Sequence, residues 1–237
     1  MTTRPTAVIT GASKGIGAAL ASRCVREGMR VALIARTPAP LQALAGSLGE
    51  LAHAFPCDLT DADAVRELAV GMDRALGAAP DVLVNNAGLF RLSPVEAMAP
   101  ADFSAVLQTN LVAPFLLTRA VLPAMRARGT GTIVTLGSIA DRRVFRTNAA
   151  LRGQQVRPAR VARGRCAWSC AAAACAATLV SPGPVNTPLW DLVNPDERPG
   201  FTPRAAMLSP EDVADAIWYA MSRPATVNID ELRLSRS

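Results

Sequence analysis

TAVITGASKGIG, residues 6–17, places a short β-rich run directly before three glycines and the start of a helix. The apolar residues that follow Gly15 recur every four positions, as on one face of a helix. Gly11 permits a tight turn, and Gly15 and Gly17 let the backbone and a ligand approach closely. In this strand–turn–helix order, the first N–H groups of the helix face a pyrophosphate. The stretch therefore predicts a dinucleotide site made by six residues: Gly11, Ser13, Lys14, Gly15, Ile16 and Gly17.

Beyond this stretch, strand-like and helix-like segments alternate along the chain, which indicates a parallel sheet with helices on both faces. The expected strands are 6–10, 30–35, 52–58 and 132–136, together with 81–88, a strand that runs into a loop, and 177–188, a strand with its loop. The expected helices start after the glycines, at 61, at about Asn110 and at 209, where Ser209 suits the N-cap. No repeat or linker interrupts the pattern. We therefore predict a single-domain, Rossmann-like α/β fold with a doubly wound parallel sheet over residues 1–237.

The net charge of +6 comes mostly from one segment. Residues 151–176 hold five arginines and no acid, so the basic balance describes this segment and argues against a nucleic-acid partner. Five cysteines with a single histidine, His53, predict no metal site. The uncharged run at 166–190 is broken by prolines, and no signal peptide opens the chain. We expect a cytoplasmic protein without membrane contact.

Two cations bear on the choice of nucleotide. Arg36 stands at the end of the second expected strand, where an acid usually binds the ribose 2′-hydroxyl of NAD, and Lys14 lies in the glycine stretch. Both suit a 2′-phosphate, which favours NADP(H) over NAD(H). The alternative is that Arg36 is a solvated surface residue.

Together with later motifs, these residues resemble the short-chain dehydrogenase/reductase family, a family of single-domain Rossmann-type oxidoreductases. The match extends over nearly the whole chain outside 151–176. The motifs that carry it are the glycine series at 11, 15 and 17, Asp58 in CDLTD, NNAG at 85–88, Asn110 in QTNLVAP, Ser138 in TLGSIA and PGPVNT at 182–187.

The resemblance implies a role for each motif. Asp58 would hydrogen-bond the adenine, NNAG would stabilise the sheet and line the ribose side, and residues 182–187 would cover the nicotinamide. Ser138 would donate a hydrogen bond to the substrate oxygen, and Asn110 would hold a water in the proton relay. Phe90, Trp190 and the loop 189–207 would lie near the substrate. The further cofactor contacts implied are Leu59, Asn85, Ala87, Gly88, Pro182, Gly183, Val185 and Thr187.

The family's proton donor is absent. Its chemistry moves a hydride between nicotinamide and a carbonyl or alcohol carbon, and a Tyr phenol moves the accompanying proton. A Lys one helical turn later lowers the pKa of that phenol. The family pattern places this pair at the positions now occupied by Leu151 and Gln155. The only tyrosine of the chain is Tyr219 and the only lysine is Lys14, so no Tyr-x-x-x-Lys exists at any position.

The genetic code offers a reason for this absence. Read one base later, codons for LRGQQ at 151–155 can spell Tyr-Ala-Ala, then Ser or Asn, then Lys or Arg. Two compensating single-base changes would preserve the length of the chain and scramble everything between them. The segment also lacks the apolar stripe of a core-facing helix. Our hypothesis is that residues 151–176 are a frame-shifted reading of the catalytic helix, by sequencing error or mutation; a divergent insert is the alternative.

The expected function is that of an NADP(H)-dependent oxidoreductase acting on a small alcohol or carbonyl, with weak or no activity as written. A catalytically inactive NADP(H)-binding sensor or partner subunit is the alternative. By the resemblance, the 151–176 helix usually forms half of a dimer interface. A homodimer or homotetramer is therefore expected if that helix is intact.

Overall fold

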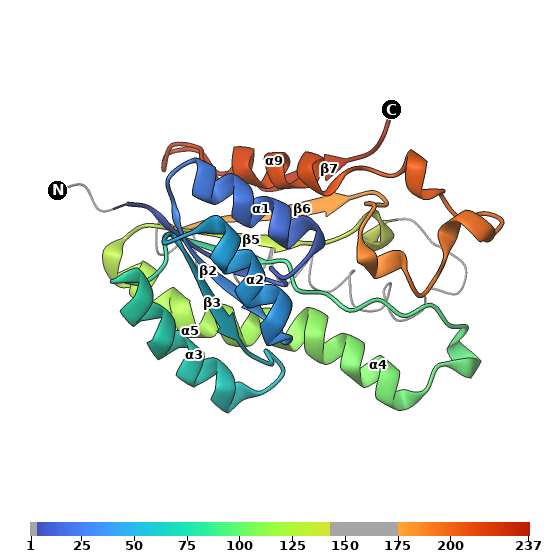
Figure 1. Cartoon of the computed structure of the whole chain (residues 1–237), viewed down its shortest axis with the longest axis horizontal. Helices are drawn as coiled ribbons and strands as arrows, with labels where there is room; N and C mark the ends of the chain where they lie inside the picture. The colour runs from blue at the N-terminus through green and yellow to red at the C-terminus, as the bar shows by residue number, and fades with distance from the viewer. Residues whose placement is uncertain (1–3, 143–174) are drawn as a thin grey trace.

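A parallel β-sheet forms the centre of the computed structural model, which describes residues 4–142 and 175–237 (Figure 1). The strand order is β3-β2-β1-β4-β5-β6-β7, so the chain reverses its direction of winding between β1 and β4. This confirms the predicted doubly wound parallel sheet. The strands are β1 (Thr6–Thr10), β2 (Arg30–Ala35), β3 (Ala52–Pro56), β4 (Val82–Asn85), β5 (Gly131–Leu136), β6 (Cys175–Pro182) and β7 (Glu231–Leu234).

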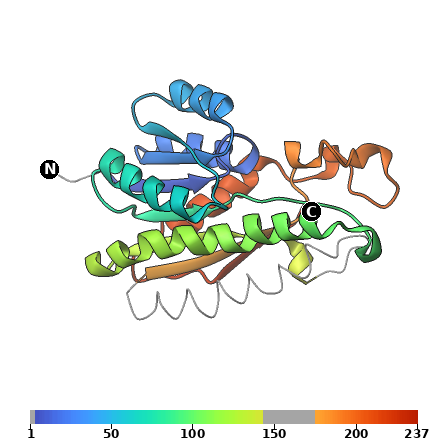
Figure 2. The ribbon, with the colours of Figure 1, turned by 90° about the horizontal axis from the view of Figure 1, so that it is seen from below.

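Helices cover both faces of the sheet, as Figure 2 shows from below. The α-helices described are α1 (Gly15–Arg26), α2 (Pro38–Leu48), α3 (Ala62–Leu76), α4 (Pro100–Leu107), α5 (Ala113–Arg128) and α9 (Pro210–Met221). Helices α1, α2 and α9 pack on one face, and α3 and α5 pack on the other. The sheet is therefore buried from both sides.

Alternation along the strands divides the core into two apolar clusters. In β1, Ala7 and Ile9 belong to the cluster under α1 and α9, whereas Val8 belongs to the cluster under α3 and α5. Successive side chains of a strand point to opposite faces, so a strand covered on both sides needs apolar residues at every position. This explains why TAVIT and RVALIA read as continuous apolar runs.

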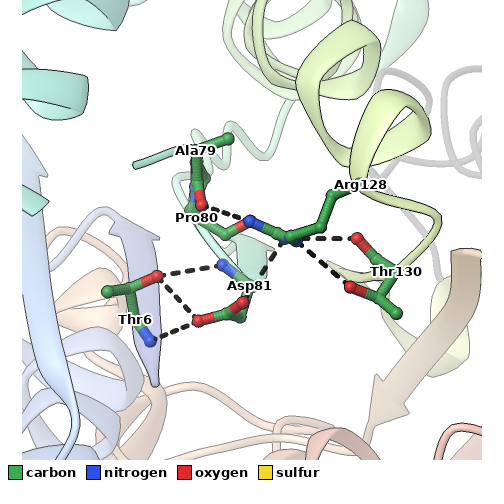
Figure 3. Close-up of polar contacts among 6 residues, drawn as sticks. All are labelled: Thr6, Ala79, Pro80, Asp81, Arg128 and Thr130. Carbon is green, nitrogen blue, oxygen red and sulfur yellow. Dashed lines mark hydrogen bonds and ion pairs between the residues drawn. The ribbon is translucent and has the colours of Figure 1, made fainter. Parts of the chain in front are cut away.

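A polar network ties the amino ends of the strands together, at the edge opposite the glycine turn (Figure 3). The backbone N–H and the hydroxyl of Thr6 both donate to Asp81 Oδ2, at 2.8 and 2.9 Å. The Arg128 guanidinium donates to the carbonyls of Ala79 and Pro80, at 2.7 and 2.9 Å. It also lies 3.4 Å from Asp81 Oδ1. The network fixes β1 against β4 and holds the end of α5 beside them.

The long helix differs from its prediction. It begins at Pro100, ten residues before Asn110, and Asn110 lies in a π-helical turn, Gln108–Val112, that joins α4 to α5. Pro114 follows this turn and has no N–H to donate, which favours the wider turn before it. Because the π-turn shifts the helical period, the apolar pattern of α4 is out of phase with that of α5. The start of the helix at Pro100 was therefore not predicted from the apolar pattern.

The strand after the anomalous segment also starts earlier than predicted. β6 begins at Cys175, which pairs with Gly131, and Ala176 pairs with Thr132. Both residues fall within the segment suspected of frame-shifting, so regular structure resumes two residues before the predicted 177. Small residues can form a central strand even if their codons are frame-shifted, because strand pairing depends on backbone hydrogen bonds.

One helix of the described ranges, Pro100–Arg128, is long and apolar enough to cross a membrane by length and composition alone. Its second half packs on the sheet through four buried residues, Ala113, Leu117, Val121 and Met125. A core-facing helix of an α/β protein has the same apolar stripe. The expectations of no membrane contact and of a cytoplasmic location stay predictions.

Candidate functional site

The glycine turn connects β1 to α1 beside the point where the winding reverses. Gly11 and Gly15 have φ angles of +63° and +58°, a region that favours glycine. Lys14 is the N-cap of α1 and is exposed, no side chain caps the helix, and its first turn holds no acid. The first N–H groups of α1 are therefore available to an anion.

Gly17 serves a close approach within the protein. A Cβ placed there would contact the Gly11 carbonyl oxygen and would lie 2.7 Å from Asn86 Nδ2 and 2.9 Å from Ala12 Cα. The first turn of α1 therefore packs directly on the glycine turn and on the segment after β4. Contact of Gly17 with the cofactor stays a prediction.

Thr10 and Asn86 lock these segments together. Thr10 Oγ1 accepts the N–H groups of Asn86 and Ala87, both at 2.9 Å, and donates to Val84 O at 3.2 Å. Asn86 Nδ2 donates to Thr10 O at 2.8 Å. Asn85, Ala87 and Gly88 of NNAG were predicted as cofactor contacts, whereas Asn86 and Thr10 were not. The NNAG motif was the sequence signal that could have indicated Asn86. No residue near Thr10 in the sequence indicates that it pairs with this motif.

Asn85, the first residue of the motif, ends β4 and is buried. Its Nδ2 donates to Thr118 Oγ1 at 3.3 Å, which joins the strand to α5. Its Oδ1 and the buried Ser181 Oγ on β6 have no hydrogen-bond partner within the described ranges. Gly88, at the other end of the motif, faces Asn110: a Cβ there would lie 3.7 Å from Asn110 Oδ1.

Ser138 lies in the loop that follows β5. It caps the short helix Ile139–Asp141, where its Oγ accepts the N–H of Ala140 at 3.2 Å. That bond leaves the hydroxyl hydrogen free to be donated elsewhere. Gly137 N donates to Val180 O at 2.8 Å, which keeps this loop beside β6. The predicted catalytic positions Leu151 and Gln155 lie outside the described residues.

The proline–glycine segment after β6 reaches the glycine turn. Pro182 ends β6, and the N–H of Gly183 donates to Leu234 O at 2.8 Å. Further on, the Thr187 side chain lies beside Gly15: a Cβ on Gly15 would be 3.1 Å from Thr187 Cγ2. Val185, between them, is buried. Two segments predicted to hold one cofactor are thus brought together.

Arg36 and Asp58 follow neighbouring strands, β2 and β3, and both are exposed. Asp58 Oδ1 accepts the N–H of Thr60 at 3.0 Å and its hydroxyl at 2.8 Å. These hydrogen bonds hold the pKa of Asp58 below its usual value, and the positive charge of Arg36 adds to the effect. Leu59 is buried beneath them in the core cluster of α3 and α5. The positive charge of Arg36 therefore acts on Asp58 across neighbouring strands at this edge.

Aromatic rings meet on the loops after β4 and β6. The ring centroids of Phe90 and Trp190 are 5.3 Å apart, edge to face, and Phe201 lies 6.4 Å from Trp190. The Trp190 indole N–H donates to Val185 O at 3.0 Å. The structure therefore brings together Phe90 and Trp190, which the sequence analysis placed near the substrate.

The described residues include a deeply buried cysteine, Cys24 near the end of α1, and the absence of a metal site stays a prediction. Burial raises the pKa of Cys24 to about 12, so its thiol stays protonated and unreactive. Within residues 4–142 and 175–237, no group of three or more His, Cys, Asp or Glu side chains could hold a metal ion.

Comparison with known proteins identifies the family. The sequence model of the family described as short chain dehydrogenase matches residues 5–150. The chain belongs to the short-chain dehydrogenase/reductase family. An uncharacterized oxidoreductase of Staphylococcus haemolyticus is 33% identical over 227 residues, which cover 95% of this chain and 94% of the relative. The sheet and the flanking helices are those of the family's solved members.

Two such members bear on the site. The closed form of serine dehydrogenase complexed with NADP⁺ is 26% identical, with a TM-score of 0.89 over 97% of this chain and 94% of that chain. A metagenomic short-chain oxidoreductase in complex with NADP is 30% identical, with a TM-score of 0.82 over 98% of this chain and 97% of that chain. Both similarities extend over nearly the whole length of this chain and of the related structures.

Proposed function

We propose that this short-chain dehydrogenase binds NADP(H) and is built for hydride transfer between nicotinamide and a small alcohol or carbonyl compound. As written, it lacks the pair that moves the proton. The observation that supports the cofactor most strongly is the uncapped start of α1, which directly follows Gly11 and Gly15 in their left-handed conformations.

The residues at this edge fit a dinucleotide. The N–H groups of α1 and the Lys14 side chain suit a pyrophosphate, and Arg36 suits a 2′-phosphate. Asp58 has an ionised carboxylate for the adenine. When bound, the nicotinamide supplies or accepts the hydride. Related solved structures with NADP in the same fold support the cofactor class.

Ser138 is the residue that would polarise the substrate. Its hydroxyl hydrogen, which the Ala140 bond leaves free, would be donated to the carbonyl oxygen. The cluster of Phe90, Trp190 and Phe201 would exclude water from this side of the site. Asn110 would hold the proton-relay water of the family. Its side-chain contacts with Leu89 also give it a positioning role.

The rest of the chain offers no substitute for the missing pair. Tyr219 lies in the last turn of α9, where the Arg223 guanidinium covers its ring at 4.2 Å. Lys14 lies at the start of α1. In a parallel α/β fold, the helices end at the edge opposite the one where they begin, so this tyrosine and this lysine cannot act together. Proton transfer by Ser138 alone would be slow.

We further propose that residues 151–176 are the frame-shifted catalytic helix. The family match ends at residue 150, one position before Leu151. The Staphylococcus relative nevertheless aligns over 95% of the chain, so the length across the segment is close to that of the family. Two compensating base changes would have this effect. The nucleotide sequence of codons 145–180 is the direct test: codons under LRGQQ that cannot yield Tyr and Lys when shifted contradict the proposal.

The matching protein experiment compares the chain as written with a chain in which 151–176 is restored to the shifted frame. Both should bind NADPH, and only the restored chain should consume it with a panel of small ketones and aldehydes. Ser138→Ala in the restored chain should abolish most of that consumption. Turnover by the chain as written at a rate typical of the family would contradict the proposed loss, and binding of neither NADPH nor NADH would contradict the proposed cofactor.

The inactive NADP(H)-binding protein, a sensor or partner subunit, is the second candidate. It is favoured by the one observation that Leu151 and Gln155 replace the proton-donating pair. If the gene carries no frame-shift and the chain consumes no NADPH with any carbonyl, this candidate replaces the first.

A further inference from the structure

The segment between β6 and α9 leaves the sheet and returns to it. Val185 and Leu208 pair in parallel where its two limbs meet. Asn186 N donates to Leu208 O, and Leu208 N donates to Pro184 O, both at 2.9 Å. Figure 1 shows the segment in orange, standing out from the sheet. Backbone hydrogen bonds between the two limbs therefore close its base, and the backbone bonds farther out, such as that from Trp190 N to Thr187 O, are local to one limb.

Arg204 makes the polar side-chain contacts that cross this segment, beside the aromatic contact of Trp190 with Phe201. Its Nη1 donates to Asn186 Oδ1 at 3.0 Å and to Thr187 O at 3.2 Å, and its Nη2 donates to Asp191 Oδ1 at 2.6 Å. Its backbone N–H donates to Asp196 Oδ1 at 2.7 Å. One guanidinium thus ties the outgoing limb, residues 186–191, to the returning limb. Charge-assisted hydrogen bonds of this kind are stronger than neutral ones.

Each limb has a further anchor. On the outgoing limb, Thr187 packs against Gly15 of the glycine turn. On the returning limb, the Arg236 guanidinium near the end of the chain donates to Met207 O at 2.9 Å and to Ala205 O at 2.5 Å. Arg204 therefore connects a limb that touches the glycine turn to a limb that is fixed on the body of the protein.

We propose that Arg204 is a positioning residue for the nicotinamide half of the cofactor. It holds the outgoing limb against the glycine turn, and without it that limb moves away. The proposal rests on the proposed binding of NADP(H), but it assigns Arg204 no contact with the cofactor. Lysine would not replace it, because a single ammonium cannot match the planar fork that reaches Asn186, Thr187 and Asp191 together.

Nucleotide titrations separate this role from a general loss of structure. Two ligands are compared, NADPH and adenosine 2′,5′-bisphosphate, which lacks the nicotinamide half. Arg204→Ala should raise the Kd for NADPH about tenfold and leave the Kd for the fragment unchanged. Arg204→Lys should restore little of the loss. Arg198→Ala is the matched control, since Arg198 is exposed in the same segment and its side chain has no polar partner within the described ranges.

Proteolysis tests the same proposal without cofactor. Chymotrypsin should cut at Phe201 and Trp190 faster in Arg204→Ala than in the parent and in Arg198→Ala, because the hydrogen bonds of Arg204 between the limbs are lost. If the parent binds neither NADPH nor NADH while this cleavage is accelerated, the proposed function fails and the tie between the limbs stands. An unchanged cleavage rate, an unchanged Kd for NADPH, or an equal loss of both nucleotides would overturn the role of Arg204.

Discussion

The side chain of Asn110 forms two hydrogen bonds with the backbone of a single residue, Leu89. Asn110 Oδ1 accepts the Leu89 N–H at 2.7 Å, and Asn110 Nδ2 donates to Leu89 O at 2.8 Å. Leu89 follows NNAG at the end of β4, and Asn110 lies in the π-turn of the long helix. The pair therefore fixes the loop that carries Phe90 to the helix that covers the opposite side of the site.

Asn110→Ala should lower the free energy of unfolding by about 1–3 kcal/mol, because two partly buried hydrogen bonds are lost and two backbone groups are left unpaired. Urea unfolding at neutral pH measures the change. Gln108→Ala in the same π-turn is the control, since its exposed side chain makes no hydrogen bond within the described residues, and it should change stability by less than about 0.5 kcal/mol. Equal effects of both changes would refute the role of the Leu89 contact.

Gly17→Ala should destabilise the protein by about 2 kcal/mol or more and weaken NADPH binding. The added Cβ would clash with the Gly11 carbonyl oxygen and lie 2.9 Å from Ala12 Cα. Because both neighbours are backbone atoms, relieving the clash requires a backbone shift that costs free energy. Gly46→Ala in α2 is the matched change, because a Cβ there meets nothing within 4 Å. It should stabilise the protein by up to about 1 kcal/mol. Thermal melts of the two variants should move in opposite directions.

Arg36→Ala should raise the Kd for NADPH by about tenfold or more and change the Kd for NADH by less than about twofold, because only NADPH carries the 2′-phosphate. Arg26→Ala removes the same charge from the far end of α1 and should leave both affinities unchanged. Fluorescence titration of the reduced nucleotides gives the four values. NADH binding by the parent that equals or exceeds NADPH binding would rule out the proposed preference.

Ser209→Ala should change the acid response of α9. The side-chain hydrogen bond of Ser209 is the main cause that holds the pKa of Asp212 below its usual 3.8, and the backbone N–H of Ser209, which donates to Asp212 Oδ2 at 2.8 Å and remains in Ser209→Ala, is the second. A carboxyl whose pKa is lowered by folding stabilises the protein above its unfolded pKa, and this contribution disappears as the pH falls through the folded pKa, below about 4. In Ser209→Ala the pKa of Asp212 should rise towards 3.8, as carboxyl NMR titration would show.

Glu211→Gln is the control for this change, because it removes a charge from the same helical turn without touching the capping box. The pKa of Asp212 should stay low in this variant. An unchanged pKa of Asp212 in Ser209→Ala would show that the Ser209 side chain is not the cause of the low value.

Several features of the fold were readable from local sequence. The strand, glycine turn and helix at 6–26 are recorded in adjacent residues, as is the capped start of α9 at Ser209. The π-turn at Asn110 was not, because such a turn breaks the period on which a helix prediction depends. The pairing of Asn86 with Thr10 was also missed, since it joins residues 76 positions apart.

The sequence alone determined the class of fold, the glycine turn between β1 and α1 and the absence of a Tyr–Lys pair, because these depend on residue types at short, fixed spacings. Only the tertiary structure decided that Thr187 meets Gly15, that Asn110 holds Leu89 and that Arg204 joins two limbs of one segment. Such contacts follow from the order of the strands, which reverses between β1 and β4 and brings distant segments to one edge. No local pattern of residues indicates that these distant segments lie together at one edge of the sheet.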